Sequence, residues 1–214
     1  MIISKYKHIS FDLDGTLVHT ASEYRYRVVF KTLNDLGSGV KSKSLIDKFW
    51  FGANRDKTIK NEFGILPQKF WKEFRKIDIP EKRSEYTEAY NDVESTLKKI
   101  KRMNKLISII TGSLPGIAKM EIKKLNDAPY DYYLSIGEEK DSGFLSKPSP
   151  GSFNYVMDKL KVMPKDTLYI GNNNEDELFA KNAGVDFIRL DRKEYESNFG
   201  NYSLATIHSL EELL

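Results

Sequence analysis

The sequence predicts an α/β fold with an open parallel sheet and a small all-helical insert, and three observations support this. Short apolar runs alternate with helical patterns over most of the chain, as they do in βαβ units. The main polar clusters directly follow apolar runs, and the carboxyl ends of parallel strands share one edge of a sheet. One long stretch is basic and patterned only as helix. We therefore expect a core domain of residues 1–17 and 87–214, and a helical domain of residues 18–86.

The core elements are expected in a regular order. The run from Ile9 to Leu13 reads as a buried strand. Further strands are expected at 106–111, 132–136, 167–170 and 186–190. Helices are expected at 93–103, 116–125, 151–160 and 175–182. The pattern of the last eight residues, 207–214, predicts a short amphipathic helix.

The insert is expected to contain helices and no strand. The first helix ends near Leu36-Gly37, two more cover 44–50 and 55–63, and Pro67 fits the first turn of a fourth. Residues 20–86 contain 15 Lys and Arg against 9 Asp and Glu, although the whole chain has a net charge of only +3. This excess is either a solvated helical surface or a field that attracts an anionic substrate.

Composition limits the class of protein. The chain has 214 residues, of which 40% are hydrophobic and 30% are charged, as in a globular protein. It contains no cysteine, which excludes disulfides and thiolate chemistry. A secretory signal pattern and an apolar stretch of bilayer length are both missing from the sequence, so we expect a cytoplasmic protein with no membrane partner. The small net charge gives no reason to expect a nucleic-acid partner.

The first polar cluster is Asp12-Leu13-Asp14-Gly15-Thr16, directly after an apolar run. Gly15 indicates a sharp turn that brings both carboxylates to one pocket. An aspartate can attack phosphorus and form an aspartyl-phosphate, and a second carboxyl can protonate the leaving group and then activate water. Mg²⁺ would relieve the repulsion between the two carboxylates with few protein ligands. The alternative is a turn or a pair of helix caps.

Three further clusters carry polar groups after apolar runs or in loops. Thr111-Gly112-Ser113 offers hydroxyls and N–H groups for a phosphate, or else Ser113 is a helix N-cap. Lys147, beside Pro148 and Pro150, could offset phosphoryl charge, or it is ordinary surface charge. The segment from Gly171 through Asn172 to Asp176 could bind a metal, or its polar residues could form a turn and cap the next helix.

Taken together, these segments resemble the haloacid dehalogenase (HAD) superfamily, in particular its phosphoglycolate phosphatase-like members with a helical C1 cap. The match to the first family motif at Asp12 to Thr16 is complete, Thr111 fits the second, and Lys147 with Pro148 fits the third. Residues 171–184 resemble the fourth motif. The resemblance implies a doubly wound, Rossmann-like core, and a cap formed by the insert.

The resemblance also implies roles for individual residues. Asp12 would be the nucleophile and a Mg²⁺ ligand, and Asp14 would be the acid/base, with its backbone carbonyl on the metal. Lys147 would bridge Asp12 and the phosphoryl group. Thr111 and Gly112, with the neighbouring Ser113, would hold the phosphoryl oxygens, and Asp176 would anchor metal-bound water.

One position departs from the family pattern. The fourth motif usually begins Gly-Asp, and here Asn172 replaces that aspartate. An amide oxygen can still coordinate Mg²⁺ but carries no charge, so weaker metal binding is expected, or a shift of the direct ligand to Asp176.

The cap would supply contacts to the rest of the substrate. Arg25, Arg27, Asn54 and Arg55 are candidates, with Arg55 favoured because it follows a turn; a surface salt bridge is the alternative for Arg55. The function expected is a Mg²⁺-dependent phosphomonoester hydrolase acting on a small anionic phosphorylated metabolite. The alternatives are a phosphosugar mutase of the same superfamily and a weak or retired scaffold with a binding role. A monomer or a homodimer fits the sequence equally well.

Overall fold

The computed structural model describes residues 1–39, 41–52, 54–137, 142–195 and 200–214. Its centre is a six-stranded parallel sheet in the order β5-β4-β1-β6-β7-β8. The strands are β1 (His8–Phe11), β4 (Leu106–Thr111), β5 (Tyr132–Ser135), β6 (Thr167–Gly171), β7 (Asp186–Leu190) and β8 (Ala205–Ile207). The chain extends the sheet on one side of β1 and later on the other, so the sheet is doubly wound and its switch point lies beside β1.

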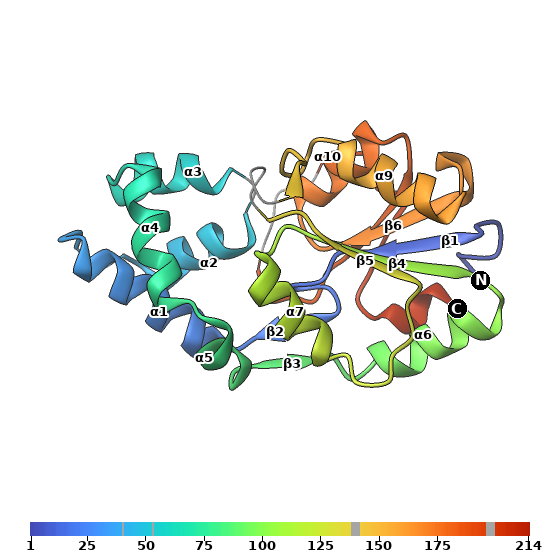
Figure 1. Cartoon of the computed structure of the whole chain (residues 1–214), viewed down its shortest axis with the longest axis horizontal. Coiled ribbons are helices and arrows are strands. Elements are labelled where there is room, and N and C mark those ends of the chain that lie inside the picture. The colour runs from blue at the N-terminus through green and yellow to red at the C-terminus, as the bar shows by residue number, and fades with distance from the viewer. Residues whose placement is uncertain (40, 53, 138–141, 196–199) are drawn as a thin grey trace.

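Helices cover both faces of the sheet (Figure 1). They are α6 (Val93–Arg102), α7 (Pro115–Lys123), α9 (Gly151–Leu160) and α10 (Asn174–Asn182). Ile9 and Phe11 of β1 belong to the apolar layer on the α6 side, whereas α9 and α10 pack with Ile110 and Tyr169 on the other side. The central strands β1, β4 and β6 are buried on both faces, as is usual for a covered parallel sheet, whereas the edge strands β5 and β8 are partly exposed. We call residues of this sheet and its helices the sheet lobe.

The insert forms a second group of helices with its own core, which we call the helical lobe (Figure 1). Its helices are α1 (Ser22–Asp35), α2 (Lys43–Phe51), α3 (Arg55–Thr58), the π-helix η1 (Ile59–Phe63), α4 (Pro67–Ile77) and α5 (Pro80–Ser84). Phe49, Phe63, Phe70 and Phe74 meet at the centre of this lobe with ring centroids 5.2–6.0 Å apart. Burial of such aromatic surface stabilises a small helical unit. The expected domain limits at 17/18 and 86/87 stay a prediction.

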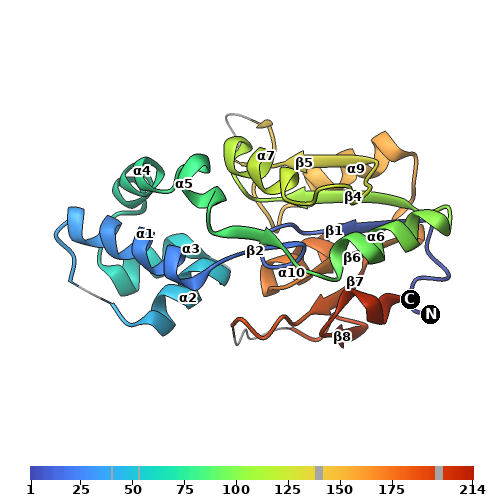
Figure 2. The ribbon, with the colours of Figure 1, turned by 90° about the horizontal axis from the view of Figure 1, so that it is seen from below.

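The prediction of no strand in residues 18–85 was wrong at one place. β2 (Val18–Thr20) pairs antiparallel with β3 (Thr87–Ala89), and together they form the connection between the two lobes (Figure 2). The two strands are only three residues long, too short for an alternating pattern to be visible in sequence. Their pairing satisfies backbone groups where the chain leaves and re-enters the sheet lobe.

The last residues also differ from expectation. The predicted helix over 207–214 is replaced by the end of the edge strand β8 and the short 3₁₀ helix η3 (Leu210–Leu213), which follows a Ser209 capping box. Elsewhere the predicted order of core elements is confirmed, as is the α/β class with a doubly wound parallel sheet. No helix in the described part of the chain has the length and apolarity that crossing a membrane requires.

Candidate active site

The three central strands of the sheet end at the predicted polar clusters. Asp12 directly follows β1, Thr111 is the last residue of β4, and Asn172 directly follows β6. Because β4, β1 and β6 are neighbours and parallel, these residues lie along one edge of the sheet. That edge, beside the switch point, is where doubly wound sheets bind ligands.

Lys147 joins two of the predicted carboxylates in the interior. Its Nζ lies 2.7 Å from Asp12 Oδ1 and 2.8 Å from Asp176 Oδ1. It also donates to the Tyr169 hydroxyl at 2.7 Å, and that hydroxyl donates to Asp176. All four side chains are buried, so the ion pairs are little screened by water. The alternative that Lys147 is ordinary surface charge is therefore excluded.

Burial and charge act in opposite directions on this cluster. Burial and the neighbouring Asp176 raise the pKa of Asp12 to about 7, and Lys147 opposes that shift. The carboxylates of Asp12 and Asp176 raise the pKa of Lys147, so its ammonium stays charged. Burial raises the pKa of the Tyr169 phenol, which therefore stays protonated as a donor. The cluster thus holds a charged lysine against the carboxylate best placed to react.

The turn after β4 is open at Gly112, whereas Thr111 beside it is buried. Thr111 Oγ1 accepts the Ser113 N–H at 3.1 Å, which leaves the hydroxyl proton of Thr111 free to donate. Nothing lies within 4 Å of the position that a Cβ would take on Gly112. Ser113 does not cap α7, because Leu114 occupies the N-cap position without a side-chain bond. The N-cap reading of Ser113 is therefore wrong.

Gly15 and Asn172 bring the turns after β1 and β6 into contact. Gly15 has φ +79°, and a Cβ there would come within 1.9 Å of Asn172 Nδ2, so a side chain is excluded twice over. Asn172 Nδ2 lies 3.5 Å from the Asp14 carbonyl oxygen. The amide nitrogen and oxygen are exchangeable by a rotation of the side chain. The Asp12 carboxylate, the Asp14 carbonyl and the Asn172 amide thus form a set of oxygen donors that fits Mg²⁺.

Asp176 has both carboxylate oxygens occupied by protein donors. Oδ1 accepts Lys147 and Tyr169, and Oδ2 accepts the Asn172 N–H at 3.2 Å. Asp176 is not the cap of α10; Asn173 is, through its side chain to the Asp176 N–H. In the described part of the chain no three acidic or histidine side chains group as a metal site. Any metal here would depend on carbonyl and amide oxygens as well as on Asp12.

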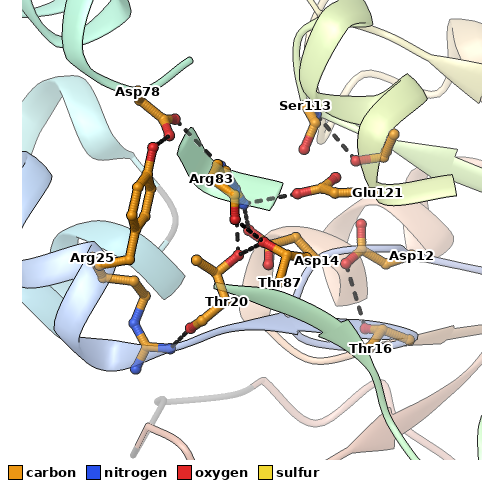
Figure 3. Close-up of polar contacts among 12 residues, drawn as sticks. Asp12, Asp14, Thr16, Thr20, Arg25, Asp78, Arg83, Thr87, Ser113 and Glu121 are labelled. Carbon is orange, nitrogen blue, oxygen red and sulfur yellow. Dashed lines mark hydrogen bonds and ion pairs between the residues drawn. The ribbon is translucent and has the colours of Figure 1, made fainter. Parts of the chain in front are cut away.

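Arg83 of α5 makes a contact that the sequence did not predict. Its Nη2 lies 2.7 Å from Asp14 Oδ2 and 2.8 Å from Glu121 Oε1 of α7 (Figure 3). Its Nη1 lies 3.3 Å from Asp78 Oδ2, and its Nε donates to the Thr20 hydroxyl. A residue of the helical lobe thus reaches the second carboxylate of the first motif.

Glu121 is fully buried, and burial raises its pKa to about 8 against the opposing charge of Arg83. Neither Arg83 nor Glu121 carries a local sequence signal, since each is one charged residue in a helix rich in charges. Only the three-dimensional contact between α5 and α7 identifies them. Tyr169 was missed for a similar reason, because in sequence it is one more apolar residue of a buried strand.

The three arginines of the helical lobe that were predicted to contact substrate lie in different environments. Arg55 is exposed at the start of α3, and its charge acts on Glu175 at the start of α10. Arg25 is buried and bound by Asp47 and Glu194, so it belongs to the framework. Arg27 stacks on the ring of Tyr86. A small pocket beside the site is lined by Gly15, Phe51, Asn172 and residues 190–195.

The fold and the site together define the class of protein. An aspartate follows the central strand of a doubly wound sheet, a lysine contacts that aspartate, and a helical lobe lies beside the edge where the strands end. The family model of haloacid dehalogenase-like hydrolases matches residues 9–190. The chain therefore belongs to this family, which confirms the expectation of a hydrolase of the HAD superfamily.

Individual relatives agree with this assignment. The chain is 28% identical to a phosphoglycolate phosphatase of Aquifex aeolicus over 83% of its own length and 81% of the relative's. It is 26% identical to a pyrophosphatase, PpaX, of Bacillus mycoides over 85% and 81% of the two lengths. The fold matches the crystal structure of a putative haloacid dehalogenase-like hydrolase of Bacteroides fragilis with a TM-score of 0.78 at 22% identity, over 98% and 100% of the two chains.

Proposed function

We propose that the chain is a Mg²⁺-dependent phosphomonoester hydrolase for a small anionic phosphorylated metabolite, acting through an aspartyl-phosphate on Asp12. The observation that carries the proposal is the 2.7 Å contact of Lys147 Nζ with Asp12 Oδ1 at the carboxyl end of the central strand. The Asp12 N–H donates to the Ile170 carbonyl at 2.9 Å, which fixes the backbone of the nucleophile to β6. The names of two relatives, phosphoglycolate phosphatase and pyrophosphatase, support a small anionic phosphorylated substrate.

In the first step an Asp12 oxygen attacks phosphorus and the bond to the leaving oxygen breaks. The Lys147 ammonium offsets the charge that the nucleophile and the phosphoryl oxygens share. The Thr111 hydroxyl and the N–H of Gly112 are proposed to bind phosphoryl oxygens. Asp14 donates a proton to the leaving oxygen, which departs as an alcohol.

In the second step water attacks the same phosphorus, Asp14 takes its proton, and inorganic phosphate and free Asp12 are formed. Bound Mg²⁺ would supply charge neutralisation for the phosphoryl oxygens and for the acidic groups around them. The residues proposed to hold it are Asp12, the Asp14 carbonyl and Asn172. Asp176 is proposed to act through Lys147, because both of its oxygens already accept protein donors.

The test is turnover of p-nitrophenyl phosphate and a panel of phosphorylated metabolites, with Mg²⁺ or with EDTA. We expect activity with Mg²⁺ only, and its loss in Asp12→Asn. Asp158→Asn, at an exposed position of α9, is the matched control and should keep full activity. Activity that survives EDTA, or an active Asp12→Asn enzyme, would refute the mechanism. Release of an isomerised sugar phosphate with little free phosphate would indicate a mutase instead.

A further inference from the structure

The guanidinium of Arg83 is held by carboxylates on three sides, and the three differ in exposure. The side chain of Asp78 is 6% exposed and that of Glu121 is 0% exposed, whereas that of Asp14 is 24% exposed. Asp78 comes from the end of α4 in the helical lobe and Glu121 from α7 in the sheet lobe. Asp78 and Glu121, both buried, thus hold the guanidinium from the two lobes. Asp14 is the partner that a ligand can reach.

Other contacts keep the guanidinium in the same place. It lies over the ring of Trp50, 4.9 Å from the centroid. Its Nε donates to the Thr20 hydroxyl (Figure 3). The Arg83 carbonyl accepts the Thr87 hydroxyl at 3.0 Å, so the backbone of Arg83 is tied to β3. Removing the Asp14 contact would therefore leave the guanidinium in position, with one N–H of Nη2 pointing at the site.

On the proposed mechanism, Asp14 must bind the leaving oxygen of the substrate within about 2.6–3.2 Å. Arg83 Nη2 lies 2.7 Å from Asp14 Oδ2. With Asp14 at its position in this structure, a leaving oxygen that takes a proton from Oδ2 lies at most about 6 Å from Nη2. A carboxylate one carbon further along is separated from that oxygen by roughly 3 Å, because single bonds to carbon are about 1.5 Å long. A leaving group that points toward Arg83 therefore brings its second anion within hydrogen-bond distance of this guanidinium.

We propose that Arg83 is a specificity-determining residue, which releases Asp14 when substrate binds and binds a second anionic group, carried by the leaving group close to its ester oxygen. This inference depends on the proposed function and names its substrate class: phosphate esters with a carboxylate, or a second phosphate, on the leaving side. A planar guanidinium with several donors suits either anion. A neutral leaving group would leave the freed N–H of Arg83 without its anion.

The experiment compares two substrates that differ only in the second anion, 2-phosphoglycolate and ethyl phosphate. The wild-type enzyme should have the larger kcat/KM for 2-phosphoglycolate. Arg83→Gln should lower that preference by about 10- to 100-fold, the usual worth of a hydrogen bond to a charged group. Arg102→Gln, an exposed arginine on α6, is the matched control and should keep the wild-type ratio. An equal loss for both substrates in Arg83→Gln would overturn the inference, because Arg83 would then only position Asp14.

Arg55 provides a second comparison, since it is the other arginine proposed to contact substrate. A fall of the ratio in Arg55→Gln with no fall in Arg83→Gln would also overturn the inference. Should Arg83→Gln fold poorly because Glu121 is left without its cation, Arg83→Gln/Glu121→Gln removes both charges. Circular dichroism establishes the fold of each variant. The double variant must show the same fall in ratio.

A binding measurement separates this inference from the proposed function. Calorimetry compares 3-phosphonopropionate with propylphosphonate, which carry the same difference in charge and undergo no hydrolysis. Wild-type protein should bind 3-phosphonopropionate at least tenfold more tightly, and Arg83→Gln should lose that difference. A wild-type protein that hydrolyses no phosphate ester refutes the proposed function alone. A wild-type enzyme that hydrolyses esters and prefers neither phosphonate refutes the assignment of Arg83 alone.

Discussion

Replacing Lys147 by Met should destabilise the protein strongly. The substitution removes the ammonium that lies 2.7 Å from Asp12 and 2.8 Å from Asp176, and it leaves two buried carboxylates without their cation. Breaking a buried pair by removing one partner costs about 3–5 kcal/mol. For a chain of this size each kcal/mol lowers the melting temperature by about 2–4 °C, so a fall of roughly 6–20 °C is expected.

The assay is urea denaturation followed by far-UV circular dichroism at pH 7.5. Circular dichroism is preferable to tryptophan fluorescence, because Trp50 and Trp71 both lie in the helical lobe and Lys147 belongs to the sheet lobe. Lys119→Met, an exposed lysine on α7, is the matched control and should change the free energy of unfolding by less than about 0.5 kcal/mol.

A double-mutant cycle tests the cause. In Lys147→Met/Asp176→Asn one of the two stranded carboxylates is neutral, so the double variant should be more stable than the sum of the single effects predicts. An interaction energy of about 1–3 kcal/mol is expected. Additive effects, or a Lys147→Met protein within about 1 kcal/mol of wild type, would refute the claim that this ammonium compensates both carboxylates.

Three further outcomes are expected. His8 is buried, and burial lowers its pKa to about 4. Below pH 6.5 the unfolded chain therefore binds a proton at His8 that the folded chain does not bind. The free energy of unfolding should fall by up to about 3 kcal/mol between pH 6.5 and pH 4. Urea titrations at several pH values should show a shallower fall in His8→Gln, and equal slopes would contradict the assignment. Asn172→Asp should tighten Mg²⁺ binding by about tenfold, because it adds a charge to the oxygen donors; calorimetry measures it, and an unchanged Kd argues against a ligand role. Glu177→Gln should speed hydrogen exchange at residues 200, 202 and 203, whose N–H groups donate to that carboxylate, while the amides of β4 keep their protection.

The sequence contained enough information for the sheet lobe and for the groups that end its strands. The first motif, Thr111, Lys147 and the turn after residue 171 are each contiguous with an apolar run or a helix start, so local patterns locate them. Parallel pairing then brings them to a common edge without any further information. The predicted roles of these residues still depend on the assays described above.

Arg83 and Glu121 could not be predicted in the same way. Their contact depends on how the helical lobe rests on α7, and Arg83 is 69 residues from Asp14 along the chain. Local sequence propensity does not indicate that α5 and α7 come into contact. The C-terminal strand β8 was not predicted, for another reason. Its three residues, Ala-Thr-Ile, fit a strand or a helix equally well, and only the pairing with β7 decides between the two.

The pairing of β2 with β3 has a mechanical consequence. Both crossings between the lobes are bonded to each other, so one lobe cannot slide past the other without breaking that ladder, and the remaining freedom is a swing about the ribbon. Arg83 lies four residues before β3 and so close to the ribbon, whereas Arg55 begins α3, which lies on the side of the helical lobe away from β2 and β3 (Figure 1). A small rotation would carry Arg55 through a wide arc and hardly move Arg83. The arginine at the pivot is thus suited to constant contact with the reaction centre, and the distant one to contacts made only on closure.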